Sequence, residues 1–114
     1  KIKNTKFLLM GFSFKENCND TRNTKVYDIY KNLKYRGGKV DIYDPLIDSK
    51  SILQNYDIKL IKKPKNNDYN VIIIAVSHNV FLKEGLKKIK QYGKSDAIIF
   101  DVKNTFPNND LLYL

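Results

Sequence analysis

The sequence predicts one α/β domain, over residues 1–114, in which helices cover both faces of a mainly parallel sheet. Apolar segments of strand length alternate along the chain with segments of helical periodicity, which is the pattern of this three-layer, Rossmann-like class. The strongest apolar segment, residues 71–76, contains no polar residue, as is typical of a strand buried on both faces. A chain of 114 residues is long enough for one such domain with a substantial core.

The first strand is predicted over residues 7–10, which are all apolar. Gly11 follows directly and allows the backbone to leave the strand at an angle that other residues rarely adopt. A polar loop comes next, and either Asn23 or Thr24 at its end can cap a helix.

The next helix is predicted over residues 25–36, because its apolar residues recur at helical spacing. Two glycines at positions 37 and 38 end it. Polar and apolar residues then alternate over residues 39–43, which predicts a half-exposed strand near the edge of the sheet. Residues 46–56 predict a short helix capped by Ser49, and residues 59–61 a minor strand.

The second half of the chain repeats the alternation of strand and helix. After the strand at residues 71–76, the spacing of Leu82, Leu86 and Ile89 predicts one helix that closes at Gly93. The last central strand is predicted over residues 97–100.

Right-handed crossovers place the carboxyl ends of all parallel strands at one edge of the sheet, where ligands of such folds bind. Four polar segments should therefore meet there: the loop around Lys15, Asp44-Pro45, residues 77–79 and residues 101–104. The first of these also carries Arg22, and a helix begins just after it. Cations beside a helix N-terminus indicate an anion site.

Known phosphate-binding motifs do not explain this loop. A GxGxxG fingerprint would need glycines at Ser13 and Glu16, and no Gly-Lys-Ser/Thr of a P-loop is present. From the residues alone, an anion site and a loop that simply carries charges remain equal alternatives.

Composition limits the other classes of function. Cys18 is the single cysteine and His78 the single histidine, so the chain has no internal disulfide and no zinc cluster, and a reducing cytoplasm is expected. No segment has the apolar length of a membrane span. The chain begins with Lys1, so we expect it to be part of a longer protein.

The net charge of +9 raises the alternative of a basic flavodoxin-like module that binds nucleic acid or a protein partner. However, 19 of the 21 basic residues are lysines, spread over every segment. Arginine is the residue that reads guanine and stacks on bases, so a solvated lysine-rich surface is the favoured interpretation, and no nucleic-acid partner is expected.

Four motifs resemble the UDP-glucose/GDP-mannose dehydrogenase family, whose members are UDP-sugar 6-dehydrogenases. Residues 11–23, GFSFKENCNDTRN, resemble the signature G-x-x-F-K-x-x-x-x-D-x-R-N that opens the C-terminal, UDP-binding domain of that family. Further matches follow in order: residues 40–45 (VDIYDP), residues 71–81 with His78 and Phe81, and residues 100–104 (FDVKN).

The resemblance implies roles for five residues. Phe14 and Lys15 match a pair that contacts the UDP moiety of the substrate, and Arg22 matches an arginine that reaches NAD. Lys103 and Asn104 match a segment in which one basic residue contacts substrate held by the neighbouring subunit; the UDP-glucose branch often has arginine at the position of Asn104.

Each of these roles has a structural alternative. Phe14 and Lys15 can be a core ring beside a surface lysine, and Arg22 can pair with Asp20 or Glu16 to fix the loop. The sequence places no acid beside His78, which favours a loop-capping histidine over a catalytic one. Asp101, at the end of a strand, can form a turn.

The resemblance also sets expectations for the whole enzyme, which would oxidise the C6 alcohol of a UDP-hexose to a carboxylate with NAD for surface polysaccharide or capsule synthesis. The family's catalytic cysteine and its NAD fingerprint lie in preceding domains, and Cys18 does not match that cysteine. The chain alone is therefore expected to have no catalytic residue and no activity. A homodimer or higher oligomer is implied, and the motifs favour the branch that acts on UDP-N-acetylhexosamines.

Overall fold

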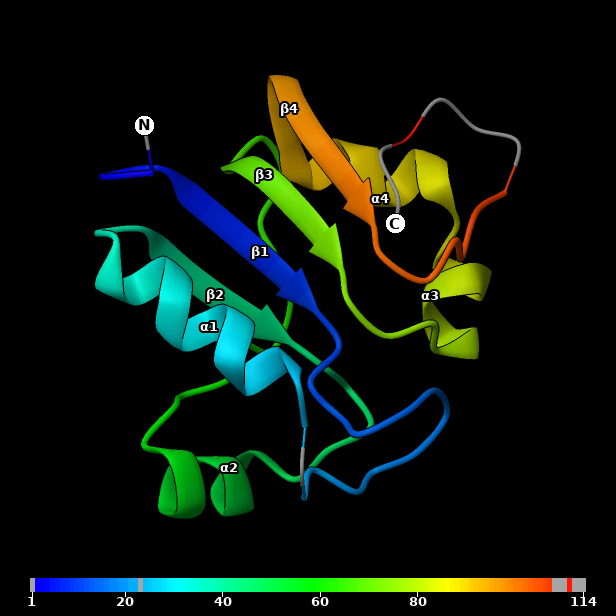
Figure 1. The fold of residues 1–114 in the computed structure, drawn as a ribbon. Helices are drawn as coiled ribbons and strands as arrows, with labels where there is room; N and C mark the ends of the chain where they lie inside the picture. Colours follow the sequence, from blue (N-terminus) through cyan, green and yellow to red (C-terminus); the bar gives the residue numbers. More distant parts are fainter. Residues whose placement is uncertain (1, 23, 108–110, 112–114) are drawn as a thin grey trace.

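Four parallel strands form one sheet in the order β2-β1-β3-β4, shown in Figure 1. The computed structural model describes residues 2–22, 24–107 and 111. The strands are β1 (Lys6–Met10), β2 (Lys39–Tyr43), β3 (Tyr69–Ile74) and β4 (Gly93–Asp101). The helices are α1 (Val26–Tyr35), α2 (Ser49–Tyr56), α3 (Asn79–Glu84) and α4 (Leu86–Tyr92). The predicted α/β class with a parallel sheet is confirmed.

The helices cover both faces of the sheet, with α1 and α2 on one side and α3 and α4 on the other (Figure 1). Successive side chains of a strand point to opposite faces, so β1 contributes to two cores. Leu9 packs with Val26 of α1 and Ile52 of α2, whereas Leu8 packs with Ile89 of α4. The predicted three layers are therefore present, and the central strand is buried on both sides.

The loop before α1 and the glycines after it set the bounds of this helix. The N-cap residue of α1 is Lys25, which makes no side-chain cap hydrogen bond, so the prediction of Thr24 as the cap is one residue early. The Thr24 hydroxyl still accepts a hydrogen bond from the Val26 N–H at 3.2 Å. Asn23, the other predicted cap, lies outside the described residues. At the other end, Gly37 has a φ of +89° and the Gly38 N–H donates to the Leu33 carbonyl at 2.9 Å.

Two predictions near the β2 edge are wrong. The cap of α2 is Asp48, whose carboxylate accepts from the Lys50 N–H at 3.3 Å, while Ser49 is the first helical residue. Residues 59–61 do not form a strand, although they lie along the outer edge of β2. The Ile61 N–H donates to the Ile42 carbonyl at 3.1 Å, and one such hydrogen bond does not make a strand ladder.

The single helix predicted through Leu82, Leu86 and Ile89 is in fact two helices. Gly85 ends the first helix with a φ of +87°, although the apolar residues keep their helical spacing on both sides of it. The change of direction buries Phe81 and Ile89 and leaves Leu82 44 % exposed.

The last two strands differ in their bounds from the predictions over residues 71–76 and 97–100. The strand β3 begins earlier, at Tyr69, and its partner β4 begins at Gly93. Tyr69 pairs with Gly93, and the register then shifts so that Val71 pairs with Ile98. Residues 93–96 carry no apolar signal, so the sequence pattern missed the first part of β4.

Candidate functional site

The loops after β1 and β3 leave from neighbouring strands whose connections run in opposite directions, β1 to β2 and β3 to β4. Such a topological switch point is where ligands bind in open parallel sheets. The Ala75 N–H donates to the Met10 carbonyl at 2.9 Å, so the two loops start in contact. The predicted meeting of polar loops at this edge is confirmed by the contacts described next.

Gly11 makes this close approach possible. Its φ is +99°, and a Cβ at this position would lie 2.6 Å from the Cβ of Val76. The Gly11 N–H donates to the Tyr43 carbonyl at 2.9 Å, which also ties the start of the loop to the end of β2. A side chain at position 11 would push the β1 and β3 loops apart.

A buried polar cluster joins three of the four loops beneath the surface. Asp44, which follows β2, is 4 % exposed and accepts hydrogen bonds from the backbone N–H groups of Phe12 at 2.7 Å, Ser13 at 3.3 Å and Leu46 at 3.0 Å. The Nε2 atom of the fully buried His78 lies 3.0 Å from the same carboxylate. These bonds compensate the cost of burying the carboxylate.

The hydrogen bonds of His78 define its tautomer. The Asn17 N–H donates to Nδ1 at 2.9 Å, so Nδ1 carries no proton and Nε2–H donates to Asp44. The Ser13 hydroxyl lies 3.2 Å from Nε2 and donates to the Lys15 carbonyl at 2.9 Å. A nucleophilic triad needs serine and aspartate on opposite ring nitrogens, whereas here both contact Nε2. The predicted loop-capping contact of His78 is thus present.

Above this cluster, a cleft with a volume of about 110 Å³ opens between the loops after β1, β3 and β4 and the start of α1. Three lysines, Lys15, Lys25 and Lys103, line it together with Phe14, which is 54 % exposed. The remaining lining residues are Ser13, Glu16, Val26, Ala75, Val76 and Ser77. Ligand pockets usually exceed about 300 Å³, so this cleft by itself is smaller than a typical ligand pocket.

Arg22 lies on the same loop and forms an ion pair with Asp20. Its Nε and Nη2 atoms donate to the two carboxylate oxygens at 3.1 and 3.0 Å, while the side chain stays 87 % exposed. The side-chain and backbone hydrogen bonds from Arg22 lower the pKa of Asp20 from 3.8 to about 2, and the same pairing raises the pKa of Arg22. The ion pair shapes the loop and leaves the guanidinium accessible to a ligand.

The loop after β4 brings Lys103 to the cleft but not Asn104. Asp101 is buried, and its carboxylate accepts from the N–H groups of Thr105 and Phe106, both at 2.8 Å. This is the predicted turn-forming role of Asp101. Asn104 has a φ of +55° within the turn and does not line the cleft, whereas Lys103 does.

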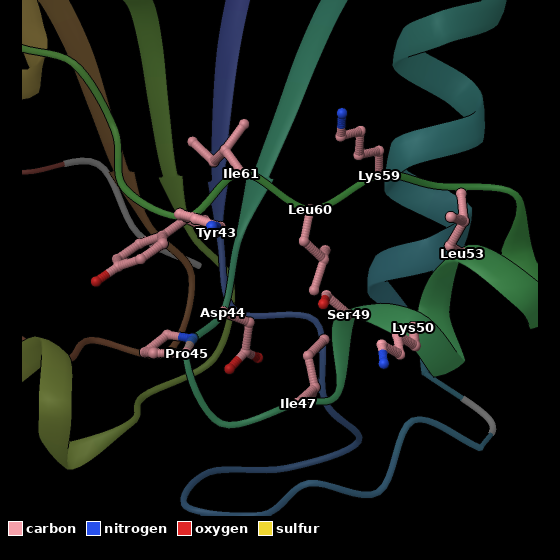
Figure 2. A pocket seen from close by; sticks show the side chains of 11 residues that line it. Tyr43, Asp44, Pro45, Ile47, Ser49, Lys50, Leu53, Lys59, Leu60 and Ile61 are labelled. Carbon is pink, nitrogen blue, oxygen red and sulfur yellow. The ribbon is translucent and has the colours of Figure 1, made fainter.

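A larger pocket of about 350 Å³ lies beside β2, between its carboxyl end, α2 and residues 59–62 (Figure 2). Figure 2 shows Leu60 and Ile47 pointing toward each other across it, while the Lys59 side chain extends away. Asp44 also lines this pocket, but its carboxylate is already bonded to His78 and to backbone N–H groups. Three lysines, Lys50, Lys59 and Lys62, also line this pocket, so what distinguishes the cleft is its place at the switch point between the loops after β1 and β3.

Other kinds of site lack support in the described part of the chain. Cys18 is partly buried and its sulfur accepts from the Asp20 N–H at 3.3 Å. Among the residues with described coordinates, no group of three or more histidine, cysteine or acidic side chains could hold a metal ion. The described helices include none that is long and apolar enough to cross a membrane.

Sequence reasoning placed Ser77 at this edge but missed the partners of His78 and one cleft residue, Lys25. Asp44 and Ser13 both follow the ends of parallel strands, so the topology places them at the right edge. The pattern gives no distance between side chains, however, and only the structure joins them to His78.

Comparison with known proteins identifies the family. The model of the UDP-glucose/GDP-mannose dehydrogenase family, UDP binding domain, matches residues 8–108. A UDP-N-acetyl-D-glucosamine 6-dehydrogenase from Salmonella typhi is 37 % identical over 106 residues, which are 93 % of this chain and 25 % of that protein. A Pseudomonas aeruginosa enzyme of the same name is 37 % identical over 90 % of this chain and 24 % of its own length.

The fold is also similar to solved structures. A UDP-D-ManNAc dehydrogenase from Pyrococcus horikoshii has a TM-score of 0.75 at 18 % identity, over 99 % of this chain and 25 % of that one. The chain thus spans about a quarter of the length of the curated relatives it matches. None of these comparisons supports the alternative of a nucleic-acid-binding module. The chain belongs to the UDP-glucose/GDP-mannose dehydrogenase family, as its UDP-binding domain.

Proposed function

We propose that the cleft at the switch point binds the UDP moiety of a nucleotide sugar, as part of an NAD-dependent UDP-sugar 6-dehydrogenase. The observation that carries this proposal is the convergence of three lysines, Lys15, Lys25 and Lys103, beside an exposed phenylalanine. A diphosphate needs positive charge, and a uracil or ribose needs an apolar surface. Glu16 is the one acidic residue in the lining, so positive charge predominates.

Each cleft residue has a distinct task. The ammonium groups of Lys15 and Lys103 neutralise the diphosphate, and the Phe14 ring packs against the uracil or the ribose. Lys25 adds charge at the start of α1, where the helix dipole also favours an anion. Asn104 supports Lys103 by holding the turn. None of these groups performs chemistry on the sugar, so the chain alone is proposed to be inactive.

The cofactor is proposed to be held mainly by another domain of the protein. This chain has no glycine-rich NAD fingerprint, and Arg22 is the residue whose exposed guanidinium fits a pyrophosphate. When bound, NAD supplies the hydride acceptor for the two-step oxidation of the C6 alcohol to a carboxylate. Arg22, oriented by Asp20, would contribute a grip on the pyrophosphate from this domain.

The substrate is proposed to be a UDP-N-acetylhexosamine, in a cytoplasmic enzyme that serves surface polysaccharide or capsule synthesis. The two relatives that share 37 % identity with this chain are named UDP-N-acetyl-D-glucosamine 6-dehydrogenases, which supports this branch. Since the chain spans about a quarter of their length, the catalytic and NAD-binding parts are proposed to lie in preceding domains. A homodimer or higher oligomer remains a proposal from the resemblance.

Steady-state kinetics of the full-length enzyme test the two roles of the loop. Lys15→Ala should raise the KM for the UDP-sugar, and Arg22→Ala should raise the KM for NAD. A hydrogen bond to a charged group is worth about 1.5–3 kcal/mol, so each increase should be about ten- to hundredfold. Lys87→Ala, an exposed lysine of α4, is the matched control and should change neither constant. Equal losses for both ligands in both variants would show that the loop is structural only.

A further inference from the structure

We propose that His78 is a positioning residue, which holds the loop that carries Phe14 and Lys15 in the conformation that binds substrate. It does so through its unprotonated Nδ1 atom, which accepts the backbone N–H of Asn17. This inference rests on the proposed function of the cleft, because it assigns the loop a ligand. It assigns a role in substrate binding to a buried residue that does not line the cleft.

The contact between His78 and the loop is reciprocal. The Asn17 N–H donates to the His78 ring at 2.9 Å, and the Asn17 side-chain oxygen accepts from the N–H of Asn79 at 2.7 Å. Asn17 also has a φ of +55°, a left-handed conformation that asparagine adopts more readily than most residues. Two hydrogen bonds to consecutive residues fix both the position and the orientation of Asn17.

The other side of the loop segment is fixed by the same cluster. The Ser13 N–H donates to Asp44, and the Ser13 hydroxyl donates to the Lys15 carbonyl at 2.9 Å. Phe14 and Lys15 therefore lie between two anchored residues, Ser13 and Asn17. With so short a span, the backbone that carries the exposed side chains at 14 and 15 is held in place before substrate arrives. Such preorganisation increases affinity by reducing the ordering cost of binding.

A neutral imidazole suits this place because it accepts on one side and donates on the other. Its Nδ1 takes the Asn17 N–H, while Nε2–H donates to the buried Asp44 carboxylate at 3.0 Å. Phe81 of α3 packs near the ring, at 5.3 Å between centroids, and offers no competing polar group. His78 thus links the ends of β2 and β3 to the loop after β1.

Two substitutions separate the two ring nitrogens. His78→Asn keeps a side-chain acceptor near the position of Nδ1, and His78→Gln keeps a polar group near the position of Nε2. In the full-length enzyme, His78→Gln should raise the KM for the UDP-sugar about fivefold and leave the KM for NAD and kcat within about twofold, since a neutral hydrogen bond is worth about 1 kcal/mol. His78→Asn should keep the KM for the UDP-sugar close to that of the parent enzyme. Equal KM increases in both variants would overturn the proposal.

Two measurements on the 114-residue chain do not depend on UDP. The chain has one histidine, so nitrogen NMR of the imidazole reports on His78 alone, and Nδ1 should be the unprotonated nitrogen at neutral pH. Amide hydrogen exchange at Asn17 should be faster in His78→Gln than in His78→Asn. A proton on Nδ1 of the unsubstituted chain would contradict the positioning role even if a variant did not fold, and so would unchanged exchange in folded variants. Absence of UDP-sugar-dependent NADH formation by the parent enzyme would instead refute the proposed function.

Discussion

Asp20 and Arg22 show how two residues of one loop can be tested separately. Hydrogen bonds from Arg22 lower the pKa of Asp20 to about 2, so the pair stabilises the folded loop fully above the ordinary value of 3.8 and loses this contribution as the pH falls through about 2. A carboxylate titration followed by NMR should therefore have a midpoint near 2 for Asp20. In Arg22→Gln the midpoint should return toward 3.8, and an unchanged midpoint would show that Arg22 is not the cause.

At the same scale, residue chemistry explains which site residues the sequence could predict. Phe14, Lys15 and Lys103 carry the motif and lie on loops after strands, so both their type and their place could be predicted, and the cleft brings them together. For His78 and Asp44, which are 34 positions apart, the topology predicted only that both lie at the same edge of the sheet, and their hydrogen bond could not be predicted. Contacts between loops depend on the register of whole strands, which residue types alone do not fix.

At the scale of elements, two glycines with positive φ have different reasons to be glycine. Gly85 separates α3 from α4 at a φ of +87°, and a Cβ there would meet no atom within 4 Å. Gly11 ends β1 at a φ of +99°, and its Cβ would lie 2.6 Å from the Cβ of Val76. Gly85→Ala should therefore cost only backbone strain, about 1–3 kcal/mol in the free energy of unfolding.

Gly11→Ala should cost that strain and a further 1–3 kcal/mol, roughly, for overpacking against Val76. Urea denaturation of both variants measures the difference. If Gly11→Ala destabilises the chain no more than Gly85→Ala does, the β1 and β3 loops do not approach each other as closely as described. The test therefore also examines the base of the cleft.

Elements with strong periodicity could be predicted, and those without it could not. The strand β1 and the helix α1 have one uniform signal each, and both lie where the pattern placed them. The prediction of a single helix across Gly85 was wrong because the apolar residues on both sides keep helical spacing. A change of φ at one glycine does not alter that spacing. Residues 93–96 of β4 are polar, so their pairing with β3 depends on the neighbouring strand and not on their own composition.

At the scale of the whole molecule, the place of Lys103 bears on whether a site is shared between subunits. The resemblance implies contact with substrate held by a neighbouring subunit, whereas Lys103 lines the same cleft as Lys15. We propose that both lysines serve the same substrate.

Mixed dimers of full-length subunits test this proposal. One subunit carries Lys103→Ala and the other lacks the catalytic cysteine that is proposed to lie in a preceding domain. If Lys103 serves its own subunit, mixed dimers have no intact site and stay as impaired as the parents. Recovery of activity on mixing would show that Lys103 acts across the interface, as the resemblance implies.

The charge of the molecule as a whole must be distinguished from the charge of the cleft. The chain carries a net charge of +9, so any polyanion is attracted to it without a specific site. A UDP site differs because it needs particular lysines and prefers uridine over other nucleosides. Two triple variants with the same charge change make this comparison: Lys15, Lys25 and Lys103 to alanine in the cleft, and Lys87, Lys88 and Lys90 to alanine on α4.

The decisive measurement is calorimetric titration of the full-length protein and these two variants with UDP, and with CDP and ADP as competitors. We expect the cleft variant to lose at least about a hundredfold in UDP affinity, since several charged contacts of about 1.5–3 kcal/mol each are removed. The α4 variant should keep the affinity of the parent, and the parent should prefer UDP. Equal weakening of both variants without preference for uridine, or unchanged UDP affinity in the cleft variant, would contradict the assignment of this cleft to UDP.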